Sequence, residues 1–375
     1  MKIRAAILRR SPVKGPYAES MPLSIETVEL DPPGPGEVLV KISAAGLCHS
    51  DLSVINGDRP RPTPMVLGHE CSGIVEELGA GVSDLKRGEQ VVMSFLPTCG
   101  HCATCVDGRA QLCEPGHAAN GAGTLLSGAR RFHCDDGAEP FHHSGVSAFA
   151  EYAVVSRRSV VRVTQDIDPV HAALFGCAVM TGVGTVVNTC RVRPGQTVAV
   201  VGLGGVGLSS VLGALASGAS RVVAIDLSED KLALARGLGA TDTFVASDPD
   251  VVEQVRAELN GGVDHAIEMA GSVKAFELAY KITKRGGKTA TAGLAAPGSS
   301  FAIPAVNLVG EERTIHGSYM GSCVPPRDIP HYISLFQRGK LPVDKLLSST
   351  GPLDDINAAF DLLNQGKVVR HVIRF

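Results

Sequence analysis

The stretch VAVVGLGGVGLSSV constrains the fold more than any other part of the chain. It places Gly202, Gly204 and Gly207 between an apolar run typical of a buried strand and a small-residue run typical of a helix. The first glycine makes a tight turn, the second lets a pyrophosphate approach backbone N–H groups, and the third lets helix and strand pack closely. This turn, which also contains Gly205 and Val206, predicts a dinucleotide-binding site.

The sequence beyond this turn alternates between strand and helix patterns. RVVAID reads as a second strand, SEDKLALARGLGA as a helix, and TDTFVAS, GVDHAIEMAG, GGKTATAGL and RTIHGSYM as further strands. Such alternation predicts an α/β domain with a doubly wound parallel sheet. Asp226 ends the second strand, where its carboxylate would bond ribose hydroxyls and repel the extra phosphate of NADP, and Lys231 would contact the same ribose. NAD is therefore the predicted cofactor.

The first 178 residues follow a different pattern. Short strands such as EVLVKISAAG, CSGIVEELG, EQVVMSFL and FAEYAVVS are broken by glycine and proline, which predicts a mainly-β, barrel-like domain. A length of 375 residues suits roughly two domains, and 44% hydrophobic with 19% charged residues is a globular composition. The tail beyond about residue 320 returns to mixed structure.

Charge and targeting signals narrow the possible partners. The formal net charge of −3 gives no electrostatic reason to expect nucleic acid or an anionic membrane as a partner. The apolar run in MKIRAAILRRSP is too short for a signal peptide, and no later run reaches about 18 apolar residues. We therefore expect a soluble, cytoplasmic protein that acts on a small molecule. In such a chain, ten cysteines favour metal binding or catalysis over disulfides.

Four of the cysteines lie close together in the stretch PTCGHCATCVDGRAQLC. Their spacing suits four thiolates closing a tetrahedral shell around one zinc ion, which leaves no position for water or substrate. The loop carries only Arg109 as a basic residue, which argues against a zinc ribbon that contacts nucleic acid. We predict a structural zinc lobe over about residues 97–115, held by Cys99, Cys102, Cys105 and Cys113.

A second set of metal-binding residue types is dispersed. AAGLCHSDL contains Cys48, LGHECSG contains His69 and Glu70, and LFGCAVMTGVG contains Cys177. Each alone is weak evidence, because an isolated cysteine in an apolar stretch is usually a core residue. Two thiolates and one imidazole are, however, the ligand set of an alcohol-oxidising zinc site with its fourth position open.

With these motifs in this order, the chain resembles the zinc-dependent alcohol dehydrogenases of the medium-chain dehydrogenase/reductase family over essentially its full length. The resemblance implies a GroES-like catalytic domain, residues 1–178 and 320–375, and a Rossmann domain, residues 179–319. It implies that the active site lies in the cleft between them.

The resemblance also implies roles around the reacting zinc. Cys48, His69 and Cys177 match the ligands, and Glu70 matches a nearby carboxylate that approaches the metal when a ligand exchanges. Asp51 matches the acid that orients the histidine ligand.

Further roles follow from the same alignment. Ser50 matches the hydroxyl that takes the alcohol proton, and Thr181 matches the residue that packs on the nicotinamide. His49 and Arg370 match the cationic pair on the pyrophosphate, and Phe95 matches an aromatic wall of the substrate pocket. Liver-type enzymes usually carry a histidine at the position of Ser53, so the outer end of the proton path is left open.

The predicted function is NAD-dependent oxidation of a primary alcohol, with aromatic and longer-chain alcohols among the candidates. The alternative is a thiol-conjugate formaldehyde dehydrogenase acting on S-(hydroxymethyl)glutathione or a similar conjugate, for which Arg130 and Arg131 are candidate contacts of the thiol cofactor's carboxylates. In a polyol dehydrogenase Glu70 would tend to be a ligand and Cys177 to be replaced. A quinone reductase would lack Cys48, His69 and the lobe.

Two further expectations concern assembly and a non-enzymatic role. A binding or structural protein would lack either the open zinc site or the dinucleotide turn, and this chain has both. The segment 117–149 resembles the extended loop of the liver-type and formaldehyde-oxidising branches, which are usually dimers. We therefore expect a homodimer, with a tetramer as the other possibility.

Overall fold

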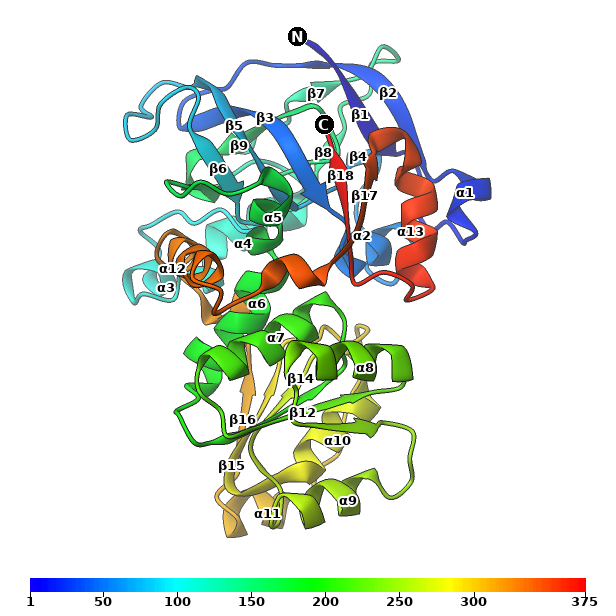
Figure 1. Ribbon diagram of the computed structural model, residues 1–375. Helices are drawn as coiled ribbons and strands as arrows, with labels where there is room; N and C mark the ends of the chain where they lie inside the picture. Colours follow the sequence, from blue (N-terminus) through cyan, green and yellow to red (C-terminus); the bar gives the residue numbers. More distant parts are fainter. The chain divides into compact units, whose positions relative to one another are not determined.

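The computed structural model describes residues 1–375, which divide into two compact units (Figure 1). Unit 1 comprises Met1–Cys177, Val324–Ser334 and Leu347–Phe375, and unit 2 comprises Ala178–Cys323 and Leu335–Leu346. The boundaries expected from the sequence, after residues 178 and 319, leave Leu335–Leu346 in the first domain. The structure groups this segment with unit 2 because its buried Val343 and Leu346 lie in a short turn that packs on a helix of that unit.

Unit 1 is built on two sheets. The first has the strand order β7-β2-β1-β4-β8 and the second the order β10-β6-β5-β3-β18-β17, with β9 paired to β3. Strands of the first sheet are β1 (Lys2–Leu8), β2 (Leu23–Leu30), β4 (Met65–Val66), β7 (Phe132–His133) and β8 (Phe141–His142). Strands of the second are β3 (Glu37–Gly46), β5 (Glu70–Leu78), β6 (Gln90–Met93), β9 (Tyr152–Ser156), β10 (Val160–Arg162), β17 (Leu347–Pro352) and β18 (Arg370–Arg374).

Alternation along β3 shows how unit 1 forms its core. Val38, Val40 and Ile42 belong to one buried apolar cluster, whereas Leu39 between them belongs to another. Successive side chains of a strand point to opposite faces, so β3 contributes apolar side chains to a core on each face, although Lys41, on the face of Leu39, is exposed. The helices of this unit are α1 (Tyr17–Ser20), α2 (His49–Ile55), α3 (Ala103–Val106), α4 (Glu114–Ala122), α5 (Pro169–Ala173), α12 (Pro325–Gln337, which ends in unit 2) and α13 (Ile356–Asn364).

Unit 2 contains one sheet of six parallel strands in the order β13-β12-β11-β14-β15-β16. Helices α7 and α8 contact each other and cover one face of the sheet, and α9 and α10 do the same on the other (Figure 1). The strands are β11 (Thr197–Val201), β12 (Arg221–Asp226), β13 (Asp242–Val245), β14 (Val263–Glu268), β15 (Thr283–Thr291) and β16 (Thr314–Gly317). The helices are α6 (Ala178–Gly184), α7 (Gly205–Ala216), α8 (Glu229–Leu238), α9 (Val251–Glu258), α10 (Val273–Ile282) and α11 (Ala305–Gly310).

This strand order is that of a doubly wound, dinucleotide-binding sheet. In chain order the strands lie as 3-2-1-4-5-6, so the order reverses at β11, and ligands of such sheets bind at that reversal beyond the carboxyl ends of the strands. The predicted fold class, a mainly-β domain plus a parallel α/β sheet, is confirmed.

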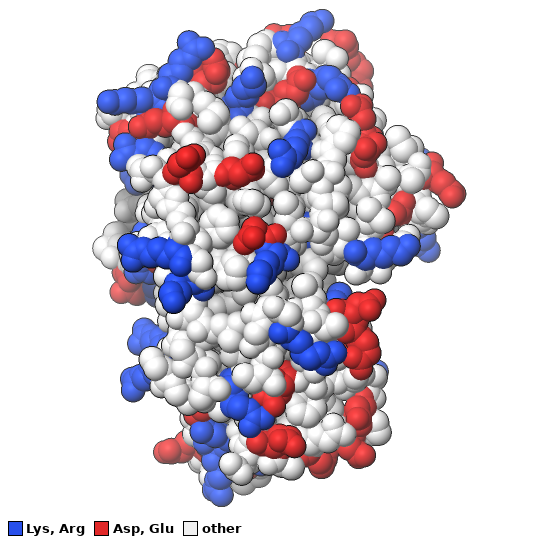
Figure 2. Space-filling view, in the orientation of Figure 1, with Lys and Arg blue, Asp and Glu red and all other residues white.

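Charged residues of both signs lie on the face of the molecule that Figure 2 draws. Figure 2 shows lysine and arginine interspersed with aspartate and glutamate over the visible face. No single helix is both long and apolar enough to cross a membrane, although one bent pair, Pro169–Gly176 with Ala178–Cys190, passes by length and composition.

Candidate active site

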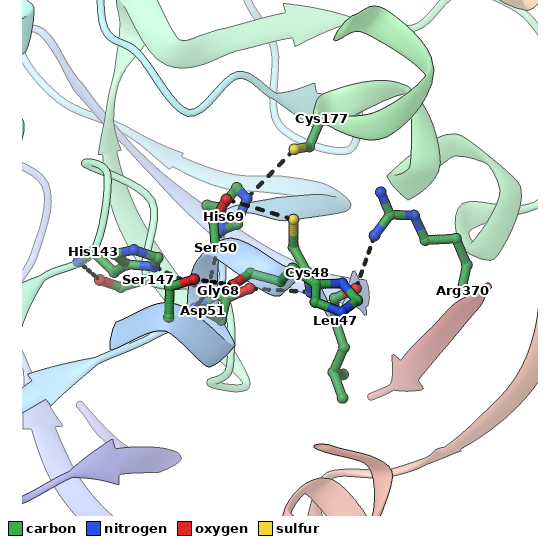
Figure 3. A network of polar contacts seen from close by, with 12 residues as sticks. Leu47, Cys48, Ser50, Asp51, Gly68, His69, His143, Ser147, Cys177 and Arg370 are labelled. Atoms are coloured by element: carbon green, nitrogen blue, oxygen red, sulfur yellow. Dashed lines mark hydrogen bonds and ion pairs between the residues drawn. The ribbon is translucent and has the colours of Figure 1, made fainter. Parts of the chain in front are cut away.

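Cys48, His69 and Cys177 lie together in unit 1. Their ligand atoms are all within 4.8 Å of one another, and all three residues are buried. Antiparallel pairing of β3 with β5 sets Gly46 opposite Glu70, so Cys48 and His69, just beyond those residues, become neighbours. Cys177 arrives from the turn after α5, where its Sγ lies 3.4 Å from His69 Nε2 (Figure 3).

This donor set fits a zinc ion. Tetrahedral coordination with bond lengths of about 2.0–2.3 Å separates neighbouring ligand atoms by roughly 3.5 Å, which agrees with the contact between Cys177 and His69. The contact between the two cysteines lowers the pKa of Cys48 and raises that of Cys177, and the thiolate is the form that binds metal. Three protein ligands leave one coordination position for substrate, which is the arrangement of a catalytic site.

Asp51 holds His69 in place from behind. Its Oδ1 accepts a hydrogen bond from Gly68 N and lies 3.1 Å from His69 Nδ1, and its Oδ2 accepts from Cys48 N. With Nδ1 occupied by the carboxylate, Nε2 is the nitrogen that faces the thiols. Burial alone would raise the pKa of Asp51, but His69 and His143 outweigh burial and hold that pKa well below its usual range.

Glu70 and Arg370 form a buried ion pair beside the cluster. Arg370 Nε lies 3.8 Å from Glu70 Oε1, and Arg370 Nη1 donates to the carbonyl of Leu47. A Cβ on Gly46 would lie 2.6 Å from Glu70 Oε1, so a glycine at 46 is what makes room for this carboxylate. Burial disfavours the charged form of Arg370, but Glu70 and the two thiols raise its pKa above the ordinary value. The assignment of Arg370 to the pyrophosphate therefore stays a prediction.

The other side chains predicted around the substrate also lie in unit 1. Ser50 Oγ is 3.7 Å from Cys48 Sγ, and the Phe95 ring meets the His69 ring edge to face with centroids 5.7 Å apart. His49 is exposed at the start of α2. Ser53 donates to the carbonyl of His49, a bond within the helix, and so offers no base to extend a proton path.

The four clustered cysteines form a second metal-binding group. The ligand atoms of Cys99, Cys102, Cys105 and Cys113 also lie within 4.8 Å of one another, and all are free thiols. Backbone N–H groups point at the sulfurs: Cys102 N donates to Cys99 Sγ, and Cys99 N donates to Cys113 Sγ. A hydrogen bond with Thr104 and backbone bonds lower the pKa of Cys102 to about 6. Burial, by contrast, raises the pKa of Cys105 to about 12. A set of four thiolates around one ion is typical of a closed structural zinc site.

The dinucleotide turn in unit 2 has the geometry that its glycines predict. Gly202 has a φ of +94°, and a Cβ on Gly207 would lie 1.9 Å from the carbonyl oxygen of Gly202. A Cβ on Gly204, by contrast, would meet nothing within 4 Å, so the space that a pyrophosphate needs is open there. Gly205 and Val206 begin α7 directly after the turn.

Residues predicted to contact the cofactor surround this turn. Asp226 ends β12, and its carboxylate accepts hydrogen bonds from Leu203 N and Ser228 N, which ties it to the turn. Lys231 lies in the first turns of α8. Thr181 lies on α6, which packs tightly on α7, since a Cβ on Gly182 would be 2.4 Å from the carbonyl oxygen of Val206.

Two arginines predicted to face a thiol cofactor's carboxylates are paired within the chain instead. Arg130 contacts Glu139 and lies over the Phe141 ring, and Arg131 contacts Glu37 through two nitrogens. Because both guanidinium groups face carboxylates of the chain here, their contact with a thiol cofactor stays a prediction.

Sequence reasoning missed His143, the second imidazole on Asp51. Its Nδ1 lies 3.0 Å from Asp51 Oδ1, and its ring meets that of His69 edge to face (Figure 3). The pair of histidines in FHHSG was the available signal, but nothing local links that pair to Asp51, about 90 residues away in the chain.

The fold and the two cysteine-containing sites together define a two-domain, zinc-dependent dehydrogenase. Residues 34–165 match the family model described as "Alcohol dehydrogenase GroES-like domain", and residues 205–338 match "Zinc-binding dehydrogenase". The chain is 37% identical to an S-(hydroxymethyl)glutathione dehydrogenase from a Synechocystis species, over the full length of both chains.

Solved structures agree with this assignment. A benzyl alcohol dehydrogenase from Acinetobacter calcoaceticus superposes with a TM-score of 0.93 at 32% identity, covering 100% of this chain and 99% of that one. A zinc-binding dehydrogenase from Sinorhizobium meliloti bound to NADP does so with a TM-score of 0.81 at 28% identity, covering all of both chains.

The chain therefore belongs to the zinc-binding alcohol dehydrogenase family. This confirms the predicted family, the oxidoreductase class and the cofactor types, zinc and a nicotinamide dinucleotide.

Proposed function

We propose that this protein catalyses the NAD-dependent, reversible oxidation of a primary hydroxyl group at a zinc ion held by Cys48, His69 and Cys177. The observation that supports this proposal is the buried set of two thiols and one imidazole, in a chain that also carries a dinucleotide turn. Zinc with three protein ligands supplies Lewis-acid polarisation of an oxygen at its open position.

The chain's own side chains have separate tasks in this reaction. Ser50, on the first turn of α2, accepts the proton of the substrate hydroxyl and passes its own proton towards the ribose of the cofactor. Asp51 fixes the orientation of His69, and the Phe95 ring gives the reacting carbon an apolar neighbour. In unit 2 the turn at Gly204 takes the pyrophosphate and Asp226 takes the ribose, which favours NAD over NADP because a carboxylate repels the additional phosphate.

Metal content tests the reaction centre. We expect two zinc ions per chain, with loss of one ion and of activity in Cys177→Ser. Cys102→Ala should lose the other ion and mainly reduce stability, because its sulfur belongs to the closed four-cysteine group. Elemental analysis of the purified variants checks both, and wild-type protein with one zinc per chain would contradict the two-site assignment.

The first substrate we propose is S-(hydroxymethyl)glutathione, which carries a primary hydroxyl on a thiol–formaldehyde conjugate. The full-length relative of that name supports this choice. The carboxylates of S-(hydroxymethyl)glutathione need cationic partners in the site, and Arg61 is the candidate for this contact. Arg61 is exposed and donates to the carbonyl of Asn120, whose side-chain amide donates to the carbonyl of Phe95. A guanidinium therefore borders the segment that carries the aromatic wall.

An aromatic primary alcohol is the second candidate. It is favoured by the edge-to-face contact of Phe95 with His69, which places an aromatic ring beside the zinc ligands. The benzyl alcohol dehydrogenase with a TM-score of 0.93 supports it as well.

NADH formation with each substrate separates the two candidates. If the conjugate is the substrate, Arg61→Leu should raise its KM about tenfold, since a charge-assisted contact to a carboxylate is lost, and should leave benzyl alcohol oxidation unchanged. Arg59→Leu, in the same loop, is the matched control. Turnover of benzyl alcohol alone, with no response to Arg61→Leu, would favour the second candidate.

We also propose a homodimer located in the cytoplasm. Ten free cysteines without a disulfide support a reducing compartment. The exposed apolar side chains of Val306 and Val309, on α11, support the dimer.

A further inference from the structure

Two imidazoles share one carboxylate oxygen behind the zinc ligands. Asp51 Oδ1 lies 3.1 Å from His69 Nδ1 and 3.0 Å from His143 Nδ1 (Figure 3). Asp51 is fully buried and His143 is 5% exposed, so water does not compete for these contacts. His143 Nδ1 is buried and has no hydrogen-bond partner, and the carboxylate of Asp51, 3.0 Å away, is its only charged neighbour at this distance.

The loop that carries His143 adopts a costly backbone to place it there. Ser144, Gly145 and Ser147 have φ values of +55°, +63° and +56°, in the left-handed region. For the two serines this conformation costs about 1 kcal/mol or more each, and it persists only where surrounding contacts fix it. One such contact is the hydrogen bond from His143 N to Ser147 Oγ, at 2.9 Å. The loop therefore holds the imidazole in a defined position against Asp51.

Without His143, the Asp51 carboxylate would be held less firmly on its Oδ1 side. Asp51 Oδ2 has one partner, Cys48 N, at 3.2 Å. Asp51 Oδ1 accepts a hydrogen bond from Gly68 N at 3.1 Å and also contacts His69 Nδ1 at 3.1 Å, so its position determines how the His69 ring is oriented. The His143 ring also packs against the His69 ring, with centroids 5.3 Å apart and planes nearly perpendicular. His143 thus restrains both the carboxylate and the ligand that the carboxylate orients.

We propose that His143 is a positioning residue of the catalytic zinc site, acting through Asp51 to fix the orientation of His69. It does not touch substrate or metal itself. Groups behind a metal ligand typically change metal affinity by about 10–100-fold when removed, because the ligand then loses part of its fixed orientation. The inference rests on the zinc site proposed above.

Two variants separate positioning from packing. His143→Gln keeps an N–H donor and removes the ring, whereas His143→Phe keeps the ring and removes the donor. We expect His143→Phe to release zinc to a chromophoric chelator about 10–100-fold faster than wild type, and His143→Gln to stay within about threefold. Cobalt substitution should show a changed thiolate-to-metal absorption band in His143→Phe only. Rapid release from His143→Gln with wild-type behaviour of His143→Phe would overturn the proposal and assign His143 to packing.

Two further variants help to interpret the zinc-release measurement. Cys177→Ser identifies which ion is lost, because it removes the catalytic ion alone. Unchanged zinc content in Cys177→Ser would refute the zinc site on which the role of His143 rests, whereas loss of one ion in Cys177→Ser with an unchanged release rate in His143→Phe would refute the role of His143 alone. If His143→Phe does not fold, Ser147→Ala serves in its place, since it removes only the acceptor that holds the His143 backbone. Faster zinc release from Ser147→Ala supports the proposal, and an unchanged release rate contradicts it.

Discussion

Single buried ionisable residues determine much of the electrostatics of unit 1. Glu70 and Arg370 are both almost fully buried, and each neutralises a charge that would otherwise be unpaired in the interior. The exposed pair of Arg4 and Asp354, about half accessible on both sides, has water as an alternative partner. Removing one partner costs about 3–5 kcal/mol for a buried pair and less than about 1 kcal/mol for an exposed one. Glu70 therefore has a structural task that does not depend on its approach to a metal.

His142 gives a pH dependence of stability with a definite sign. Burial, with Arg131 and Arg130 adding to it, lowers the pKa of His142 to about 3, whereas an unfolded chain has about 6.5. The pKa of His142 is lower in the folded than in the unfolded chain. Its contribution to the free energy of unfolding is therefore complete above about pH 6.5 and is lost as the pH falls. The expected slope is about 1.4 kcal/mol per pH unit between pH 6 and 4.

The variant His142→Gln tests this contribution. Glutamine keeps an acceptor for the N–H of Arg131, which now donates to His142 Nε2, but it does not titrate. The free energy of unfolding in urea, measured from pH 8 to pH 4, should fall less steeply for the variant than for wild type. Parallel curves, separated by a constant offset at all pH values, would show that only packing had changed and would contradict the prediction.

At the scale of elements, sequence patterns predicted those strands and turns whose contacts join residues close together in the chain. RVVAID predicts a strand that the structure has over the same residues as β12, and EVLVKISAAG coincides with β3. The glycine turn was likewise predictable from the sequence, because its three glycines lie within six consecutive residues. The pairing of β18 with β3 was not predictable from the sequence, since it joins residues some 325 positions apart along the chain. His143 and Glu37, the partner of Arg131, were missed for the same reason, because each lies about 90 positions from the residue that it contacts.

Gly207→Ala should remove cofactor binding through a backbone clash. The added Cβ would lie 1.9 Å from the carbonyl oxygen of Gly202, so the turn must open or α7 must shift. We expect NADH affinity, measured by fluorescence titration, to fall at least tenfold. Gly237→Ala on α8 is the matched control: its Cβ would meet nothing within 4 Å, and it should raise stability by about 0.5–1 kcal/mol without changing affinity. Normal NADH binding by Gly207→Ala would contradict the close-packing role.

At the scale of the whole molecule, one edge of the unit 2 sheet lacks a neighbour within the chain. β16 is the last strand of the order, and three of its four residues are exposed. Next to it in sequence, α11 exposes Val306 at 75% and Val309 at 80%. Exposed edge strands are normally protected by charge, bulges or cover, and clustered exposed apolar side chains mark interaction surfaces. A second copy of this chain would cover both features.

The dimer can be tested with one charge placed in that surface. In Val309→Glu a buried interface would have to accommodate an unpaired carboxylate, so we expect the wild type to sediment at twice the 39.0 kDa chain mass and the variant to dissociate at micromolar concentration. Val106→Glu, on α3 of the zinc lobe and 74% exposed, adds the same charge elsewhere and should remain dimeric. A dimer that survives Val309→Glu but not Val106→Glu would move the interface to unit 1, because an apolar side chain of equal exposure would then be the one that the partner covers.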